Sequence, residues 1–269
     1  MSGLILESEE LAWLLNALHA KAVVGLDDPS LFPGERQIRD ATWDVGLKKL
    51  QEHKWVVPAQ GPGQWRMNDD LMWLVAVVAD PEFVLVTIRS RSKSEQTVVL
   101  HYLADKTIVQ LTAAGKGQYG LGVVPDLATL WSRMGDLLAL PAPGQASASA
   151  RFSIDPQMLT SAQELVAAGE VEAAAAVLRK EDLAAADREA FLAALAGVAR
   201  GEMGVVHVIR AQAGQVQSDR KVTFVRQAGQ AWLVHRPSEG AALTVESVQD
   251  GSLGQVLGPY LDRATGAKP

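Results

Sequence analysis

The stretch VLVTIRS, residues 84–90, returns in modified form as VVHVIRA, residues 205–211. Both stretches are rich in Val and Ile, which favour strands because branched side chains pack well on a pleated surface. Val84 corresponds to Val205, 121 positions later. This pair of strands organises the rest of the chain, because further matches follow it at nearly the same offset.

Two more segments recur in the same order. VVLHYLADKTIVQL, residues 98–111, matches VTFVRQAGQAWLVH, residues 222–235, and LATLWSRMGDLL, residues 127–138, matches DGSLGQVLGPYL, residues 250–261. These matches pair Ile108 with Trp232 and Leu130 with Leu253. We therefore predict an internal duplication in which each copy holds strands, a tight hairpin and a closing amphipathic helix, with a mostly antiparallel sheet.

Each β part is preceded by a helical part. In the first copy Leu11, Leu14, Leu15 and Leu18 have the i, i+3, i+4, i+7 spacing of a helix, with Ser8 as the expected N-cap. In the second copy Asp155-Pro156 predicts an N-cap followed by proline at the first helical position, and a later apolar stripe from Phe191 stops at Gly201. We expect one α+β repeat over residues 1–140, a linker over 141–150 and a second repeat over 151–269.

The composition of the chain argues against several classes of function. The 269 residues are 48% hydrophobic and carry 25 basic against 31 acidic side chains, so the net charge of −6 does not favour nucleic acid. Cysteine is absent, which excludes disulfides and thiolate sites. Glutamates interrupt the first apolar stretch, and the longest apolar run, residues 71–79, is too short to cross a bilayer. We therefore expect a cytoplasmic protein with no membrane partner.

Three glycines, Gly115, Gly117 and Gly120, have the G-x-G-x-x-G spacing of a dinucleotide-binding loop. That loop works only where a strand runs directly into a helix. Here LGVVPDL follows, and its residues disfavour a first helical turn. The equivalent stretch of the second copy, RPSEGAA at 236–242, has a single glycine. We interpret the glycines as a turn.

The sequence lacks the usual catalytic and metal-binding patterns. The five histidines do not have the spacing of a shared metal site, and His207 and His235 lie in predicted strands, where we interpret them as solvated or hydrogen-bonded residues. Nucleophile elbows and P-loops are absent from the sequence. We expect no enzyme, no catalytic residue, no cofactor and no metal.

Two binding functions remain open. The order helix, helix, then a hairpin with Gly61-Pro62-Gly63 at its tip is that of a winged helix, although residues 35–66 carry only six basic against four acidic side chains. A DNA-binding regulator with a winged helix is therefore the alternative function. The loop RSRSKSEQ, residues 89–96, is cationic, with Arg89, Arg91 and Lys93 two positions apart, which would point them the same way if the strand continued. It is either a solvated hairpin tip or a partner-contacting loop.

The duplicated layout resembles the EspG family, the cytosolic chaperones of ESX (type VII) secretion. The resemblance is carried in the first half by LESEELAWLLNAL, ADPEFVLVTIRS and VVPDLATLWSRMGDLLALP, and in the second half by DREAFLAALAGVARGEMGVVHVIR and GQAWLVHRP. The five tryptophans between residues 13 and 73 and the short basic loop depart from what the family leads us to expect.

The resemblance implies an α+β fold with quasi-two-fold symmetry, in which helical bundles flank a central sheet. It also implies a non-catalytic chaperone that binds the apolar tip of a helical PE–PPE-type secretion substrate. The loop before Val98 matches by position a loop that contributes to client contact in the family, so the implied partner-binding residues are Arg89, Arg91, Lys93 and Ser94. The expected partner is thus a helical protein rather than nucleic acid, and homodimer formation is left open.

Overall fold

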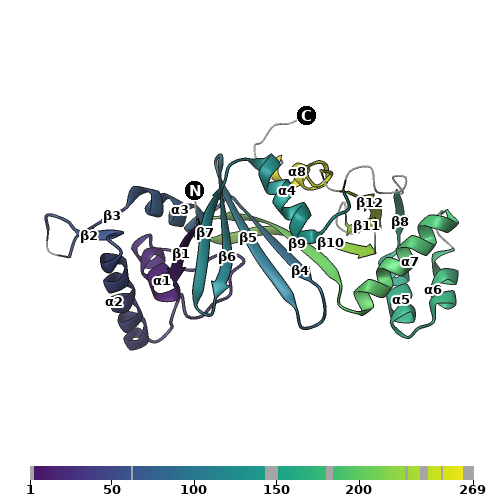
Figure 1. Cartoon of the computed structure of the whole chain (residues 1–269), viewed down its shortest axis with the longest axis horizontal. Coiled ribbons are helices and arrows are strands. Elements are labelled where there is room, and N and C mark those ends of the chain that lie inside the picture. The colour runs from purple at the N-terminus through teal and green to yellow at the C-terminus, as the bar shows by residue number, and fades with distance from the viewer. Residues whose placement is uncertain are drawn as a thin grey trace. The chain divides into compact units, whose positions relative to one another are not determined.

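The computed structural model describes residues 3–61, 63–142, 151–179, 184–227, 230–236, 242–249 and 251–262. Most of the expected linker 141–150, most of the stretch 236–242 and the expected hairpin tip at Pro62 lie outside these residues. The described residues form an α+β fold built on one large sheet (Figure 1).

The large sheet has ten strands in the order β1-β7-β6-β5-β4-β9-β10-β11-β12-β8. Neighbours run antiparallel in the pairs β1–β7, β7–β6, β6–β5, β10–β11, β11–β12 and β12–β8, which confirms the expected antiparallel sheet. The strands are β1 (Leu4–Glu7), β4 (Phe83–Ser90), β5 (Gln96–Ala104), β6 (Thr107–Gly115), β7 (Gln118–Val124), β8 (Arg151–Ile154), β9 (Met203–Gln212), β10 (Gln215–Gln227), β11 (Gln230–His235) and β12 (Leu243–Val248).

The order of elements recurs along the chain. A short strand, helices, four strands and a closing helix occur in this order from β1 to α4 and again from β8 to α8, and the first stretch has two additional short strands between its second and third helices. The helices are α1 (Ser8–Ala17), α2 (Arg36–Glu52), α3 (Asp69–Ala79), α4 (Leu127–Leu138), α5 (Pro156–Ala167), α6 (Val171–Leu178), α7 (Ala185–Ala199) and α8 (Leu253–Asp262). The matched residues Ile108 and Trp232 are both buried, as are Leu130 and Leu253. This order supports the internal duplication, which itself stays a prediction.

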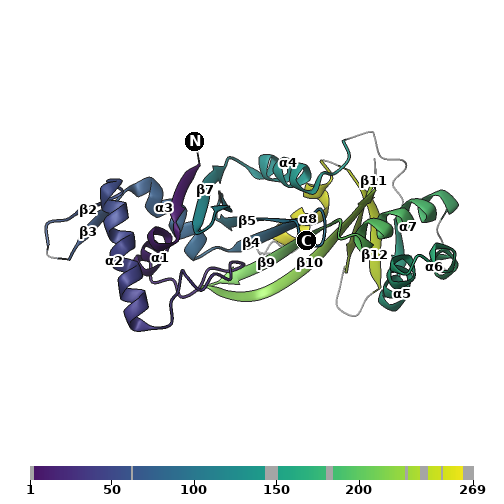
Figure 2. The same cartoon turned by 60° about the horizontal axis from the view of Figure 1, so that its bottom comes forward.

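Contacts divide the chain into two compact units that interleave in sequence. Unit 1 comprises residues 1–86, 99–126 and 209–219, and unit 2 comprises residues 87–98, 127–208 and 220–269. In unit 1, α1 and α3 lie against β7 and α2 packs on α1, whereas in unit 2 α7 lies against β11 and α5 and α6 pack on α7 (Figure 2). These units do not coincide with the two repeats expected at 1–140 and 151–269, which stay a prediction.

Helix α1 of unit 1 forms where the leucine stripe predicts it, with Leu11, Leu14 and Leu15 buried. Its N-cap is Glu7 rather than Ser8. Strand β1 runs straight into the helix and brings Ser8 to the β6–β7 turn, where its hydroxyl donates to the Gly117 carbonyl at 3.1 Å. The expectation that Ser8 caps the helix is therefore wrong, because the serine is used to fix the helix to the sheet.

Helix α2 crosses α1 at very close range. A Cβ built on Gly46 would lie 2.0 Å from the carbonyl oxygen of Glu9, so only glycine fits at the crossing. A small antiparallel hairpin of β2 (Val56–Pro58) and β3 (Trp65–Met67) follows α2, and α3 comes next. The order helix, helix, hairpin expected from the sequence is therefore present, and a winged helix in the N-terminal part stays a prediction.

Unit 2 has an aromatic core beneath its helices. Asp155 caps α5 as predicted, accepting hydrogen bonds from the backbone N–H groups of Gln157 (2.8 Å) and Met158 (3.4 Å). Phe152, Phe191 and Trp232 pack edge to face with ring centroids 5.4 to 6.3 Å apart. None of the helices in the described ranges is long and apolar enough to cross a membrane.

Candidate functional site

The glycine-rich stretch forms a hairpin turn. Strand β6 ends at Gly115 and β7 begins at Gln118, and the two strands pair antiparallel around a turn in which Gly117 has φ +71°. No helix follows the glycines directly, so the N–H groups and dipole that would bind a phosphate are not assembled there. The interpretation as a turn is confirmed.

His235 on β11 is a hydrogen-bonded sheet residue, as expected. Its Nδ1 lies 3.2 Å from the Tyr260 hydroxyl and its Nε2 lies 3.5 Å from a carboxylate oxygen of Glu246. Burial lowers the pKa of His235, and Arg151 adds to this effect, while Glu246 opposes it. Within the described ranges no group of three or more His, Cys, Asp or Glu side chains is arranged to hold a metal ion.

The basic loop connects β4 to β5 in unit 2 and has a defined conformation. The Arg91 backbone N–H donates to the Glu95 carbonyl at 3.0 Å, which closes the loop. Inside it, the Ser92 hydroxyl oxygen accepts from the N–H groups of Ser94 at 3.4 Å and Glu95 at 3.1 Å. Such serine turns replace backbone hydrogen bonds that a strand would supply, so the loop presents its side chains from a fixed backbone.

The turn that follows α7 packs directly against this loop. Gly201 has φ +89°, and a Cβ built there would lie 2.6 Å from the Lys93 nitrogen and 2.8 Å from the Ser92 carbonyl carbon. The two backbones are therefore in direct contact. Any side chain at position 201 would push the loop away, because backbone atoms cannot rotate aside.

Arg89 anchors the loop at its base rather than facing outward. It is 6% exposed, and its guanidinium donates to the Leu137 carbonyl near the C-terminal end of α4 at 3.0 Å. Burial lowers the pKa of Arg89, as do the neighbouring cations Arg226 and Arg91, while Glu202 opposes them. The side chain stays charged, because an arginine guanidinium is not deprotonated in proteins.

The other three predicted residues, Arg91, Lys93 and Ser94, are exposed. Arg91 has 66% of its side chain exposed and lies 3.2 Å from the Glu95 carboxylate. Arg89, Arg91 and Lys93 would point the same way only if the strand continued, and this condition is not met. Strand β4 ends at Ser90, so its alternation does not continue into the loop.

Sequence reasoning missed several neighbours of this loop. Arg200, which pairs with Glu202 at 2.9 Å, follows α7 directly and precedes Gly201, the residue on which the loop rests. Val98, the third residue of β5, is 41% exposed and adds an exposed apolar side chain to the strand that leaves the loop. Gly201 was recognised only as a helix stop, because the sequence does not say what packs on it. The arrangement offers charge, hydrogen bonds and an apolar contact, which suits binding.

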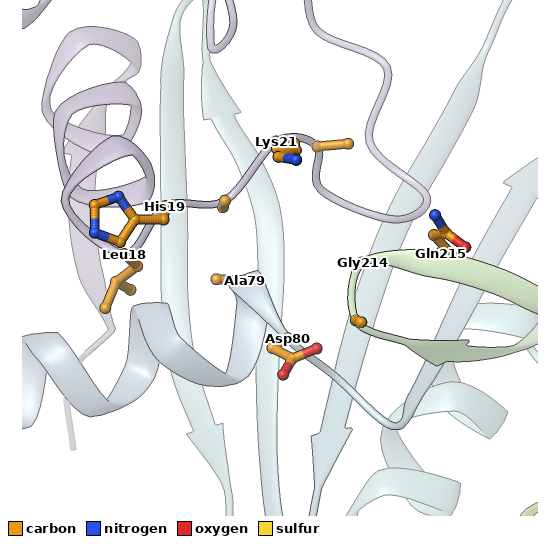
Figure 3. Close-up of a pocket in the computed structure, with 10 residues that line it drawn as sticks. Leu18, His19, Lys21, Ala79, Asp80, Gly214 and Gln215 are labelled. Atoms are coloured by element: carbon orange, nitrogen blue, oxygen red, sulfur yellow. The ribbon is translucent and has the colours of Figure 1, made fainter.

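Unit 1 contains a separate hollow of about 410 Å³ (Figure 3). Its walls come from the end of α1 with the residues after it (18–22), the end of α3 (Ala79 and Asp80), and the tip of the β9–β10 hairpin (213–215). In Figure 3 the side chains of Lys21 and Asp80 lie on different sides of the hollow. His19 and Ala213, which line it, both have positive φ values, 59° and 51°.

Comparisons with known proteins give one kind of match. Neither the models of known protein families nor the curated proteins match this chain. Among solved structures, one similar structure is that of the Mycobacterium tuberculosis type VII secretion system chaperone EspG5 in complex with the PE25–PPE41 dimer. The alignment covers 91% of this chain and 90% of the other, with a TM-score of 0.62 and 15% identity. The EspG-like fold expected from the sequence is therefore confirmed.

Proposed function

We propose that this protein is a cytosolic, non-catalytic chaperone of type VII secretion that binds the apolar tip of a helical PE–PPE-like substrate. The observation that carries the proposal is the shared fold over 91% of the chain with the EspG5 structure, which contains a PE25–PPE41 dimer. The similarity runs along nearly the whole length of both chains, so both units belong to the shared architecture.

Such a chaperone has a clear physical task. An exposed apolar helical tip promotes association with other apolar surfaces. A protein that covers the tip stabilises the monomeric substrate by mass action until export. This task needs a rigid binding surface and no reactive group, which agrees with the chemistry of the β4–β5 loop.

Within this function we assign the loop residues two roles. Arg91, Lys93 and Ser94 contact the substrate, since they are exposed on a backbone held by the serine turn. Arg89 positions the loop through its hydrogen bond to Leu137. Val98 supplies an apolar contact, which a substrate with an apolar tip requires.

The test is affinity capture of the tagged protein from its native cytoplasm, at moderate salt and with nuclease present. A helical, secretion-type protein recovered at a one-to-one ratio supports the proposal. Recovery of the bait alone overturns it. Material that disappears with nuclease would favour the winged-helix regulator, whose binding to duplex DNA should weaken steeply as salt rises.

A charge-reversal variant then tests the loop. Arg91→Glu combined with Lys93→Glu should reduce retention of the substrate, because both side chains are exposed and their loss leaves the core intact. The matched control is Lys106→Glu combined with Lys116→Glu, which reverses two exposed lysines in turns of unit 1. Equal retention by both double variants would remove the loop from the binding site while leaving the chaperone function standing.

A further inference from the structure

Helix α3 in unit 1 exposes a tryptophan within an acidic surface. Trp73 is 47% exposed, although tryptophan is one of the residues that gains most from burial. Asp69 and Asp70 lie one turn before it and Asp80 lies two turns after it, so all three fall on or near its face of the helix. Large exposed aromatic residues are typical anchors of protein interfaces.

Ordinary helix electrostatics explains two of these carboxylates. Asp69 and Asp70 lie in the first turn of α3, where negative charge is favoured by the helix dipole. Asp80 is the C-cap, where negative charge is unfavourable, and the last turn holds no basic residue. Among the described residues none forms an ion pair with its carboxylate. The electrostatics of α3 therefore does not explain why an aspartate occupies position 80.

The hollow described above adjoins Asp80, which is the only carboxylate among its lining residues, and two helix ends contribute to its walls. The C-terminal ends of α1 and α3 both form its walls, through Leu18 and Ala79, and helix C-termini carry partial negative charge. Helix α1 also has no basic residue in its last turn. Lys21 lines the hollow on a different side from Asp80. A volume of about 410 Å³ accommodates a long cationic side chain with part of its backbone.

We propose that this surface, comprising Trp73, Ala76, Asp80 and the adjoining hollow, binds a segment of a partner protein that carries arginine or lysine. The cationic group enters the hollow against Asp80, and a neighbouring apolar or cationic side chain packs on Trp73. Two turns of α3 separate Trp73 from Asp80, roughly 10 Å at 1.5 Å per residue. A partner helix would match this distance with residues seven apart, and an extended segment with residues three apart.

This inference goes beyond the proposed function. The surface lies in unit 1, whereas the loop assigned to the secretion substrate lies in unit 2, and the two surfaces carry opposite charge. The chain would therefore bind a second, cationic protein through residues that the substrate loop does not use.

The first test uses two small probes that differ only in charge. N-acetyl-L-arginine amide, titrated into the ¹⁵N-labelled full chain, should shift the amide signals of residues 18–22, 79–80 and 213–215 and the indole N–H of Trp73. N-acetyl-L-citrulline amide, its neutral counterpart, should shift them at least fivefold less at equal concentration. Equal shifts with both probes, or arginine shifts elsewhere only, would overturn the proposal.

Variants then locate the site. Asp80→Asn should abolish the arginine-specific shifts, while Asp44→Asn, which neutralises an exposed aspartate on α2, should leave them unchanged. For a labelled helical peptide with leucine and arginine seven positions apart, Trp73→Ala should weaken binding at least tenfold. The same peptide with citrulline in place of arginine should bind wild type as weakly as it binds Asp80→Asn. Binding that is indifferent to both substitutions contradicts the proposal, whatever the substrate loop does.

Discussion

Replacing Gly46 by alanine sets two physical effects against each other. Gly46 lies inside α2, where alanine is a better helix former by about 1 kcal/mol. Against this, the new Cβ would lie 2.0 Å from the Glu9 carbonyl oxygen and 2.6 Å from its carbon. Both atoms belong to the backbone at the start of α1, so the strain cannot be relieved by a side-chain rotation.

The steric effect should win. Overpacking a close contact typically costs about 1 to 3 kcal/mol, and a backbone obstacle puts this site at or beyond the upper end of that range. The helices must separate by more than 1 Å, which also loosens the buried contacts of Leu11, Leu15 and Leu50. After subtraction of the helix-propensity gain, we expect Gly46→Ala to lower the free energy of unfolding by about 2 kcal/mol.

Urea denaturation followed by tryptophan fluorescence measures this well, because five of the seven tryptophans lie in unit 1, together with Gly46. The matched control is Asp44→Ala, an exposed position on the same helix, which gains helix propensity without a steric penalty and should change stability by less than about 0.7 kcal/mol. A Gly46→Ala protein as stable as Asp44→Ala would refute the reasoning, since it would mean that α1 and α2 do not cross at this distance.

Three further predictions follow from the same structure. Gly201→Ala should displace the β4–β5 loop and weaken substrate retention while far-ultraviolet circular dichroism stays unchanged. Arg89→Leu, which removes a buried charged donor, should cost about 1 to 3 kcal/mol in urea denaturation, whereas Arg91→Leu should cost less than about 0.5 kcal/mol. Burial raises the pKa of Asp28, but hydrogen bonds from Tyr119 and Ser30 outweigh it and lower the pKa below its usual 3.8. The stabilisation is therefore present above about pH 4 and lost on acidification, so the cost of Tyr119→Phe, about 1 kcal/mol at pH 7, should shrink at pH 3.

Local sequence signals predicted the elements of this fold well. The leucine spacing located α1 and its buried face, because a helix must repeat its apolar residues every three to four positions. Asp155-Pro156 located the start of α5, because capping depends only on the next few backbone N–H groups. The matching strands at Val84 and Val205 indicated one sheet with repeated elements, since the residue pattern of a buried strand is itself local.

Features that depend on distant parts of the chain escaped prediction. Gly46 and Gly201 look like ordinary helix residues or helix stops in the sequence, yet each is required by a backbone from elsewhere, at Glu9 and at Lys93. Serine is a residue type that commonly caps helices, but the Ser8 hydroxyl donates to the Gly117 carbonyl, more than a hundred residues away. No local pattern encodes these contacts, because they arise only after the strands have paired.

The distribution of charged residues on the surface also escaped prediction from the sequence. Counting charges along the chain gave a slight acidic excess and no patch, because Asp69, Asp70 and Asp80 are diluted by the apolar residues of α3 between them. Once the helix forms, its apolar residues turn inward and the aspartates remain outside around Trp73. Conversely, the run of Arg89, Arg91 and Lys93 looks like one cationic patch, but folding buries its first member. Surface charge in this protein is therefore determined by which side chains the helices and strands expose, and a count along the sequence does not show this.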